Sequence, residues 1–347
     1  MDEGAIRAVS AEVESVGGGE ADLPANPFHA PWFVAAASGR LTPPPGWAEA
    51  AGARLPTRPA RRLGRLPLPH REGLHHDHCF LGVPDLAPGR EAEGLTGLAR
   101  GASLLRLRAV PEDDPAHAAL AGLPGARIVA TRERACLRAG LPYEAHLADA
   151  LRGKKRKELR RQRARLEETG AVTEHVDQDA DGLAAWTDAF LALEAEGWKG
   201  EAGTAMRERP QEAAFLRDML AGAGAGGALR RFALRVDGRP AVMVIGLAAR
   251  DGGLYTYKIA HDPALSRYSP GVMGMLMVTR HVLGTGEGGE GSEGGAAYAD
   301  SCAAEGHPMI DGLWRERRRL HDWIVPGGAA SRAVIEGLTL ARLARRP

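Results

Sequence analysis

The second half of the chain contains three apolar segments in series, each with the length of a strand: Leu229 to Val236, Ala241 to Ala249 and Leu254 to Ala260. Asp237-Gly238 and Asp251-Gly252 lie between them, and Asp-Gly pairs are typical of tight hairpin turns. An apolar helix pattern over Val272 to Leu283 follows, and then a strand pattern over Ala296 to Ser301. This order predicts a three-stranded antiparallel meander that continues through a helical crossover into a parallel strand.

Further helix and strand patterns lie on both sides of the meander. Before it we expect a polar helix, a strand, an amphipathic helix and another helix, over Ala145 to Thr169, Ala171 to Val176, Leu183 to Leu193 and Gln211 to Leu220. After it we expect a helix over Pro308 to Arg317, a strand over Leu320 to Val325 and a final helix. The sequence therefore predicts a fold that contains both helices and strands, α/β in the broad sense and α+β in the narrow one. A mixed sheet is expected, with helices on its faces.

The first half is less regular, with short strand and helix patterns between proline-rich turns. The strand patterns cover Leu63 to Leu68, Cys79 to Val83, Leu104 to Val110 and Ile128 to Thr131, and the helix patterns cover Pro31 to Ala37 and Glu91 to Arg100. Residues 1–26 lack hydrophobic periodicity and are predicted to be a mobile leader. We divide the rest into a small unit over residues 27–143 and a larger one over residues 144–347, with a Gly/Glu-rich loop at 284–295.

Charge and cysteine content narrow the functional classes. The chain has 347 residues, and its 45 basic and 44 acidic residues nearly cancel, so overall charge gives no reason to expect a polyanionic partner. The three cysteines are far apart and form no CxxC pair, which favours a reducing compartment, and we expect a cytoplasmic protein. No apolar run is long enough to span a membrane.

The segment "SRYSPGVMG" begins the helix that follows the meander. A helix start presents unpaired N–H groups and the positive end of the helix dipole, which together form an anion site. Pro270 fixes the turn, Gly271 permits a close approach, and Arg267 can add charge, so Ser269, Pro270, Gly271, Gly274 and Arg267 are candidate ligands of a pyrophosphate. Locally the same residues also suit the plain start of a buried helix.

Several motifs in this order resemble one family of transferases. The segments "RRQRARLEETG", "LEAEGWKGEAGTA", "YTYKIAHDPALSRYSPGVMGM" and "DSCAAEGHPMIDGLW" resemble Gcn5-related N-acetyltransferases (GNAT) of the CelD/BcsL type, which are linked by name to cellulose biosynthesis. These acetyltransferases are related to the FemABX aminoacyl transferases. The resemblance covers about residues 145 to 325, and the first half resembles the family only weakly, through "NPFHAPWF" and "HDHCFLGVPDL".

The resemblance implies two tandem GNAT-like units, the first degenerate, with acetyl-CoA or another acyl-CoA as co-substrate and no metal. The coenzyme would lie where the strand over Leu254 to Ala260 parts from the strand over Ala296 to Ser301, with its pyrophosphate on the amides of Ser269 to Gly274. Two departures stand out. "RYSPGVMG" replaces the usual glycine-spaced phosphate loop, and "HPMIDGLWRER" lacks the tyrosine that often protonates the leaving thiolate.

Three residues are candidates for proton transfer. Asp300 ends the strand at the crossover, and His307 stands just before the next predicted helix, where a carboxylate or an imidazole could accept a proton from the acceptor. Glu194 ends the amphipathic helix. A capping role for Asp300 and a structural role for His307 are the competing interpretations.

Four residues are candidates for substrate contact. Trp198 and Lys199 lie in the Gly-rich segment "EGWKGEAGTA", although they could equally cap the core and face solvent. Tyr257 and Lys258 are neighbours on a strand, so only one of them can line the cleft unless a bulge intervenes. The stretch "HREGLHHDHC" is rich in metal-binding residue types, but no second ligand cluster follows at a zinc-like spacing, and we expect no metal.

Nine basic residues between Arg152 and Arg165 crowd one predicted helix. The helix could be solvated, or it could contact a polyanion such as a coenzyme phosphate, tRNA or an acidic glycan. The leading hypothesis is an acyl-CoA-dependent transferase that acts by direct attack of a small-molecule or glycan-related acceptor. The alternatives are an aminoacyl-tRNA-dependent transferase and a non-catalytic partner of a polysaccharide-synthesis assembly.

Overall fold

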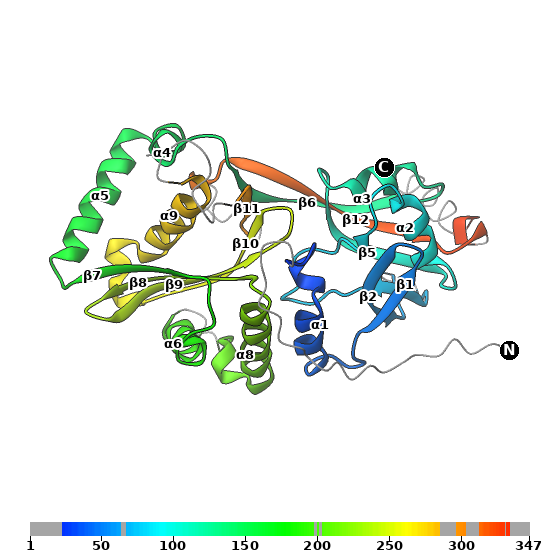
Figure 1. The fold of residues 1–347 in the computed structure, drawn as a ribbon, viewed down its shortest axis with the longest axis horizontal. Coiled ribbons are helices and arrows are strands. Elements are labelled where there is room, and N and C mark those ends of the chain that lie inside the picture. Colours follow the sequence, from blue (N-terminus) through cyan, green and yellow to red (C-terminus); the bar gives the residue numbers. More distant parts are fainter. Residues whose placement is uncertain are drawn as a thin grey trace, which may run out of the picture.

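The structure is a computed structural model that describes residues 23–63, 67–197, 200, 203–284, 296–302, 312–329 and 331–333. Within these residues, twelve strands form one mixed sheet that runs through both halves of the chain (Figure 1). The strands are β1 (Gly46–Ala50), β2 (Ala53–Ala60), β3 (His70–Gly73), β4 (Asp85–Leu86), β5 (Leu104–Pro111), β6 (Arg127–Arg138), β7 (Val172–Asp177), β8 (Leu229–Val236), β9 (Arg239–Ala248), β10 (Gly253–His261), β11 (Tyr298–Asp300) and β12 (Glu316–Pro326). Their order is β1-β2-β3-β5-β12-β6-β11-β10-β9-β8-β7, and β4 pairs with β2 off this path.

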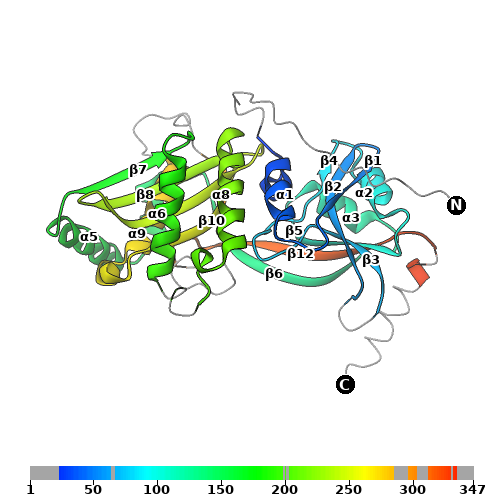
Figure 2. The same ribbon diagram turned by 90° about the horizontal axis from the view of Figure 1, so that it is seen from below.

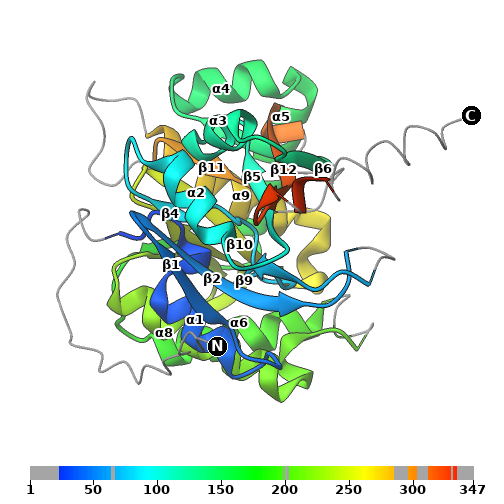
Figure 3. The ribbon, with the colours of Figure 1, turned by 90° about the vertical axis from the view of Figure 1, so that its right-hand side faces the viewer.

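Helices cover both faces of the sheet. They are α1 (Pro31–Ser38), α2 (Glu91–Ala99), α3 (Pro115–Gly122), α4 (Tyr143–Ala150), α5 (Gly153–Glu167), α6 (Leu183–Glu196), α8 (Pro210–Ala225) and α9 (Pro270–Leu283). In the second half α5 and α9 lie on one face, whereas α6 and α8 lie on the other (Figures 1 and 3). Figure 2 shows α1, from the first half, beside α8 on this second face. No helix among the described residues is long and apolar enough to cross a membrane.

The predicted meander and crossover are confirmed. β8, β9 and β10 pair antiparallel in series, and β10 then pairs parallel with β11. The side chains of α9 pack on one face of these strands in a cluster that includes Met273, Val278 and Phe232. Those of α6 and α8 pack on the other face in a larger cluster that extends into the first half. The sheet is therefore the layer that separates two apolar cores.

The two halves share strands across the sheet. β12, near the C-terminal end, lies between β5 and β6 of the first half, and β6 in turn pairs with β11. Pattern analysis predicts the β12 strand, but it assigns it to the unit over residues 144–347 because an apolar pattern does not identify a pairing partner. Residues 23–26 of the predicted leader are packed, since Leu23 and Asn26 are buried.

Several elements differ from the sequence-based expectation. The predicted polar helix is two helices, because Leu151 and Arg152 are extended between α4 and α5. Residues 79–83 form no strand, and the amide of Asn26 instead donates to the carbonyls of Leu81 and Val83. β12 begins at Glu316, where a helix was predicted. Strands β1, β2, β3 and β4 and helix α3 were not predicted, and residues 67–68 of the strand predicted over Leu63 to Leu68 form no strand.

Candidate active site

The parallel pairing of β10 with β11 is short. Gly253, Leu254 and Tyr255 pair with Tyr298, Ala299 and Asp300, and the rest of β10 pairs only with β9 among the described residues. An unpaired strand edge offers backbone N–H and C=O groups to a ligand. β11 ends at Asp300, so beyond this point, here called the parting of β10 and β11, the described residues leave that edge of β10 open.

A bulge in β10 lies at this parting. The register with β9 shifts between Thr256 and Lys258, so Tyr257 is the extra residue. As a result Tyr257 and Lys258 face the same side: Tyr257 packs in the cluster formed with α6 and α8, and Lys258 Nζ lies 3.4 Å from Glu194 Oε1 on α6. Because of the bulge, Tyr257 and Lys258 can both lie on the same side of the strand.

Glu194 is a buried carboxylate with both oxygens engaged. Its Oε1 pairs with Lys258, and its Oε2 accepts a hydrogen bond from the Met206 amide at 3.0 Å. Only 3% of Glu194 is exposed. These contacts fix the position of the Lys258 ammonium beside the bulge, because a buried charge must be paired to be stable.

Tyr257 carries a buried polar atom next to the bulge. Its hydroxyl has no hydrogen-bond partner among the described residues, and burial raises the pKa of Tyr257 well above its usual value. The hydroxyl therefore stays protonated at neutral pH and can donate to a bound group. A buried hydroxyl without a partner is costly to the stability of the protein.

Tyr257→Phe is expected to leave the free energy of unfolding unchanged or to raise it by about 1 kcal/mol, because the variant removes a buried hydroxyl without a partner. Urea denaturation of both proteins checks this expectation. Tyr298→Phe is the matched control, because the Tyr298 hydroxyl donates to Asp251 Oδ2 at 2.8 Å, so that its loss should destabilise the protein. A clear loss of stability in Tyr257→Phe would show that the hydroxyl is satisfied within the protein.

Asp300 lies at the parting, in contact with two buried arginines. Its Oδ1 is 3.2 Å from Arg134 Nε and accepts a hydrogen bond from the Cys302 amide at 3.0 Å, and its Oδ2 is 3.7 Å from Arg318 Nη1. Asp300 has no exposed surface. The carboxylate is paired with two guanidinium groups from β6 and β12, so these contacts favour a role in holding β11, β6 and β12 together over a role as a base.

The start of α9 is partly closed to an anion. Ser269 has a φ of 54°, in the left-handed region, and its carbonyl accepts from the amides of Val272 and Met273 at 3.0 and 3.2 Å. The Ser269 amide donates to Ser266, and Pro270 has no N–H. At the turn itself, only the Gly271 amide is without a hydrogen-bond partner among the described residues. It is therefore the one predicted amide of the turn that can still bind an anion.

The other two predicted phosphate ligands have different surroundings. A side chain at Gly274 would place its Cβ 2.8 Å from Val242 Cγ2, so glycine is needed there for the close packing of α9 on β9. Arg267 is exposed beside the helix start, with its guanidinium 4.7 Å from the centre of the Tyr268 ring. The Arg267 carbonyl accepts from Gln162 of α5 at 3.3 Å, which places the basic helix next to this turn.

Three predicted site residues, Trp198, Lys199 and His307, lie outside the described residues. The same holds for residues 285–295 of the predicted Gly/Glu-rich loop. Across the part of the chain that the structure describes, no three His, Cys, Asp or Glu side chains come together as metal ligands would.

Pattern analysis missed a cluster of charged and aromatic side chains where the first half meets α8. His78 Nε2 is 2.8 Å from Glu212 Oε2, and Arg40 pairs with the other oxygen of Glu212. Arg40 also donates to His76 Nδ1 at 3.0 Å. Tyr257 is close by, with its ring centre 6.0 Å from that of His78. The histidine-rich stretch was the available signal, but it was weighed only as a metal site.

Burial sets the protonation of this cluster. It lowers the pKa of His78 to about 4, with a further lowering by the charge of Lys258 and a partial rise from Glu212. Burial alone would raise the pKa of Glu212, but the hydrogen bonds from Arg40 and His78 bring it below its usual value. At neutral pH the cluster therefore holds a neutral imidazole against an ionised carboxylate.

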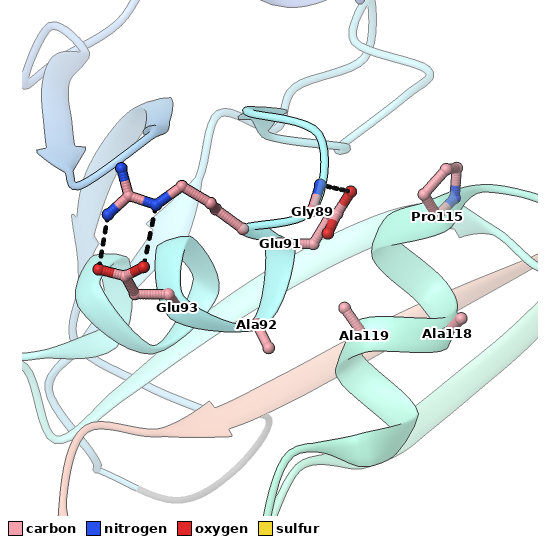
Figure 4. Close-up of a pocket in the computed structure, with 8 residues that line it drawn as sticks. Gly89, Glu91, Ala92, Glu93, Pro115, Ala118 and Ala119 are labelled. Atoms are coloured by element: carbon pink, nitrogen blue, oxygen red, sulfur yellow. Dashed lines mark hydrogen bonds and ion pairs between the residues drawn. The ribbon is translucent and has the colours of Figure 1, made fainter.

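A surface depression of about 530 Å³ lies elsewhere, between α2 and α3 (Figure 4). Its charged groups satisfy one another: Arg90 pairs with Glu93 at 2.8 Å, and Glu91 accepts from the Gly89 amide at 3.0 Å. The remaining lining consists of proline, alanine and glycine. Nothing in this depression supplies chemistry, so the candidate site stays at the parting of β10 and β11.

Comparison with known proteins agrees with this geometry. Residues 153–288, from α5 to just beyond α9, match the family described as an acetyltransferase (GNAT) domain. Comparison with curated proteins gave no match. The segment that carries the meander, the bulge and the α9 turn is thus similar to GNAT acetyltransferase domains, and this match supports an acyltransferase.

Solved structures share the whole arrangement at low sequence identity. FemX is 10% identical, with a TM-score of 0.53 and coverage of 88% of this chain and 94% of the other. A conserved protein of unknown function from Bacteroides thetaiotaomicron is 13% identical, with a TM-score of 0.53 and coverage of 87% and 91%. L-PGS from Bacillus licheniformis is 13% identical, with a TM-score of 0.50 and coverage of 87% and 90%. At this identity the likeness concerns the fold.

Proposed function

We propose that this acyltransferase moves an acyl group, most simply acetyl, from acyl-CoA to an amine or hydroxyl of a small-molecule or glycan-related acceptor. The observation that carries the proposal is the bulge at Tyr257, within the matched residues 153–288, beside the point where β11 ends at Asp300. We further propose the CelD/BcsL type within the superfamily and a cytoplasmic site of action. The described cysteines are free and buried, which fits a reducing compartment.

The thioester would lie along the open edge of β10. A bulge leaves backbone groups without a partner in the ladder, so an N–H at the bulge can polarise the thioester carbonyl and stabilise the oxyanion that forms on attack. The acceptor attacks directly, and the protein contributes by orienting the two reactants.

The pyrophosphate would lie at the start of α9. The Gly271 amide and the helix dipole attract the anion, and the exposed Arg267 lies one turn earlier. The basic face of α5 is adjacent through Gln162 and can hold the terminal phosphate.

Gly271→Asp is expected to weaken acetyl-CoA binding by about 100-fold. The new carboxylate would occupy the place of the pyrophosphate and repel it, so the pyrophosphate would lose its contacts with the helix dipole and with the amide of residue 271. Isothermal titration of the variant and the wild type measures the change, and circular dichroism checks the fold. Gly271→Asn is the matched control without charge and should lose less affinity. Equal affinities for the aspartate variant and the wild type would place the pyrophosphate elsewhere.

The function itself is tested by thiol release. Purified protein is mixed with acetyl-CoA and a panel of small amines, amino sugars and polyols, and free CoA is followed with a thiol reagent while mass spectrometry detects the acetylated product. Release above the buffer rate together with product supports the proposal. Absence of any product with protein that binds acetyl-CoA would favour a non-catalytic role in a polysaccharide-synthesis assembly.

One observation favours a second candidate, transfer from aminoacyl-tRNA. Six basic side chains of α5 are exposed: Lys154, Lys155, Lys157, Arg160, Arg161 and Arg165. FemX shares the fold. A tRNA-dependent protein should bind tRNA with an affinity that falls steeply as salt rises, and replacing Lys154, Lys155 and Lys157 by glutamine should flatten that dependence. Binding that is insensitive to salt would remove this candidate.

A further inference from the structure

The cluster at the junction of the two halves contains a histidine in the arrangement of a general base. His78 comes from the loop after β3, and its ring stacks on Phe215 of α8, with ring centres 5.1 Å apart and planes at 28°. Its Nε2 lies 2.8 Å from Glu212 Oε2 on the same helix. Stacking and this hydrogen bond together fix the orientation of the ring.

The contact with Glu212 determines the tautomer. An ionised carboxylate only accepts hydrogen bonds, so Nε2 of His78 carries the hydrogen and Nδ1 keeps its lone pair. Nδ1 has no hydrogen-bond partner among the described residues, and it is not among the nitrogens closed off from solvent. By contrast, His76 Nδ1 accepts from both Arg40 and the His78 amide, which leaves it no capacity as a base.

Glu212 is itself held in place. Arg40 pairs with its Oε1 while His78 occupies Oε2, and the Arg40 guanidinium lies 5.5 Å from the centre of the Phe215 ring. Two residues from the first half therefore meet one carboxylate from the second. A carboxylate fixed in this way orients the imidazole and stabilises the imidazolium that forms when it takes a proton.

His78 also adjoins the proposed thioester site. Its ring is 6.0 Å from that of Tyr257, the bulged residue, and the Lys258 charge is close enough to lower its pKa. Phe80 of the same loop is 5.9 Å from the Tyr257 ring and adds an apolar wall. The first half thus brings a base to the side of β10 from which an acceptor can approach.

We infer that Nδ1 of His78 accepts the proton of the attacking amine or hydroxyl, with Glu212 and Arg40 as positioning residues. This inference rests on the proposed acyl-CoA function. The acceptor's electron pair forms a bond to the thioester carbon, its proton passes to Nδ1, and the carbon–sulfur bond breaks to release the CoA thiolate. The imidazolium then returns its proton to the thiolate or to solvent, so no group is left changed.

The test compares variants in thiol release with acetyl-CoA and the best acceptor of the panel. His78→Gln keeps a donor toward Glu212 but cannot accept a proton at neutral pH, and kcat/KM should fall about 10²- to 10⁴-fold with the dissociation constant for acetyl-CoA unchanged. The wild-type kcat/KM should decline on the acid side as His78 is protonated, and the variant should lack this decline. The exposed His175→Gln serves as the control and should match the wild type.

A second variant guards against a folding defect in the first. Glu212→Gln keeps an acceptor for Nε2 but removes the charge that raises the pKa of His78, so the acid decline should move to lower pH. The other groups facing His78 are Arg40, His76, Lys258 and Tyr257, and they stay in place in this variant. If kcat/KM declines at the same acid pH in both variants as in the wild type, the cluster has a structural role only.

The outcomes separate the two proposals. Failure of the wild type to bind acetyl-CoA overturns the acyl-CoA function. Binding and turnover by the wild type with full activity in His78→Gln overturns the inference alone.

Discussion

Lowering the pH from 7 to about 5 is expected to reduce the free energy of unfolding by several kcal/mol, about 1–2 kcal/mol for each of three buried histidines and the half-buried His75. Burial lowers the pKa of His29 to about 3, of His75 to about 4, of His76 to about 2 and of His78 to about 4. The charge of a neighbouring arginine adds to the lowering at His75 and His76.

The sign follows from proton binding. Each of these rings has a lower pKa in the folded protein than in the unfolded chain, so the unfolded chain binds more protons at acid pH. The stability that the neutral rings contribute is fully present above pH 6.5 and is lost as the pH falls from there toward the folded-state values. Urea denaturation at several pH values measures this slope.

His29→Leu is the variant that reports on this effect, because His29 is buried in the first half and burial is the largest cause of its lowered pKa. In this variant unfolding should take up about one proton fewer at acid pH, so the free energy of unfolding should fall less steeply with pH. His175→Gln on the exposed strand β7 should leave this dependence unchanged. A free energy of unfolding that is constant from pH 7 to 5 would mean that these rings titrate as they do in water.

Asp300→Asn is expected to lower the free energy of unfolding by about 3–5 kcal/mol, because it leaves the buried Arg134 and Arg318 without the carboxylate that they share. Asp113 still pairs with Arg318 at 3.0 Å, so most of the loss arises at Arg134. Urea denaturation of wild type and variant measures the difference.

A double variant identifies the cause. Adding Arg134→Met to Asp300→Asn removes the buried charge that the first change leaves unpaired, and stability should partly return. A catalytic base would behave differently, since Asp300→Asn would then abolish turnover with a stability change below about 1 kcal/mol. That result would contradict the structural role favoured here.

Much of the second half could be predicted because its signals are local. Alternating Asp-Gly turns and apolar segments identify β8, β9 and β10, and the Pro-Gly step identifies the start of α9. The first half was harder to predict, because β2 contains two prolines, Pro56 and Pro59, and proline is rare inside strands. The position of β12 between β5 and β6 is likewise a long-range pairing that no local pattern specifies.

The candidate site divides in the same way. The crossover strand and the start of α9 were predicted from local pattern, and Glu194 was a candidate through its place at the end of the amphipathic helix. The bulge at Tyr257 is one extra residue in the pairing of two strands, so it is defined by the partner β9 and not by its own sequence. His78 and Glu212 are 134 positions apart, and only the fold brings their side chains together.

The most direct test of the acyl-CoA site is isothermal titration of the wild-type protein with acetyl-CoA, with adenosine 3',5'-bisphosphate as a reference for the nucleotide part alone. The proposed site predicts one binding event in the micromolar range, about −7 to −8 kcal/mol, with weaker binding of the nucleotide fragment. The absence of a binding signal up to millimolar acetyl-CoA would contradict the proposed site. Aminoacyl-tRNA would then become the favoured acyl donor.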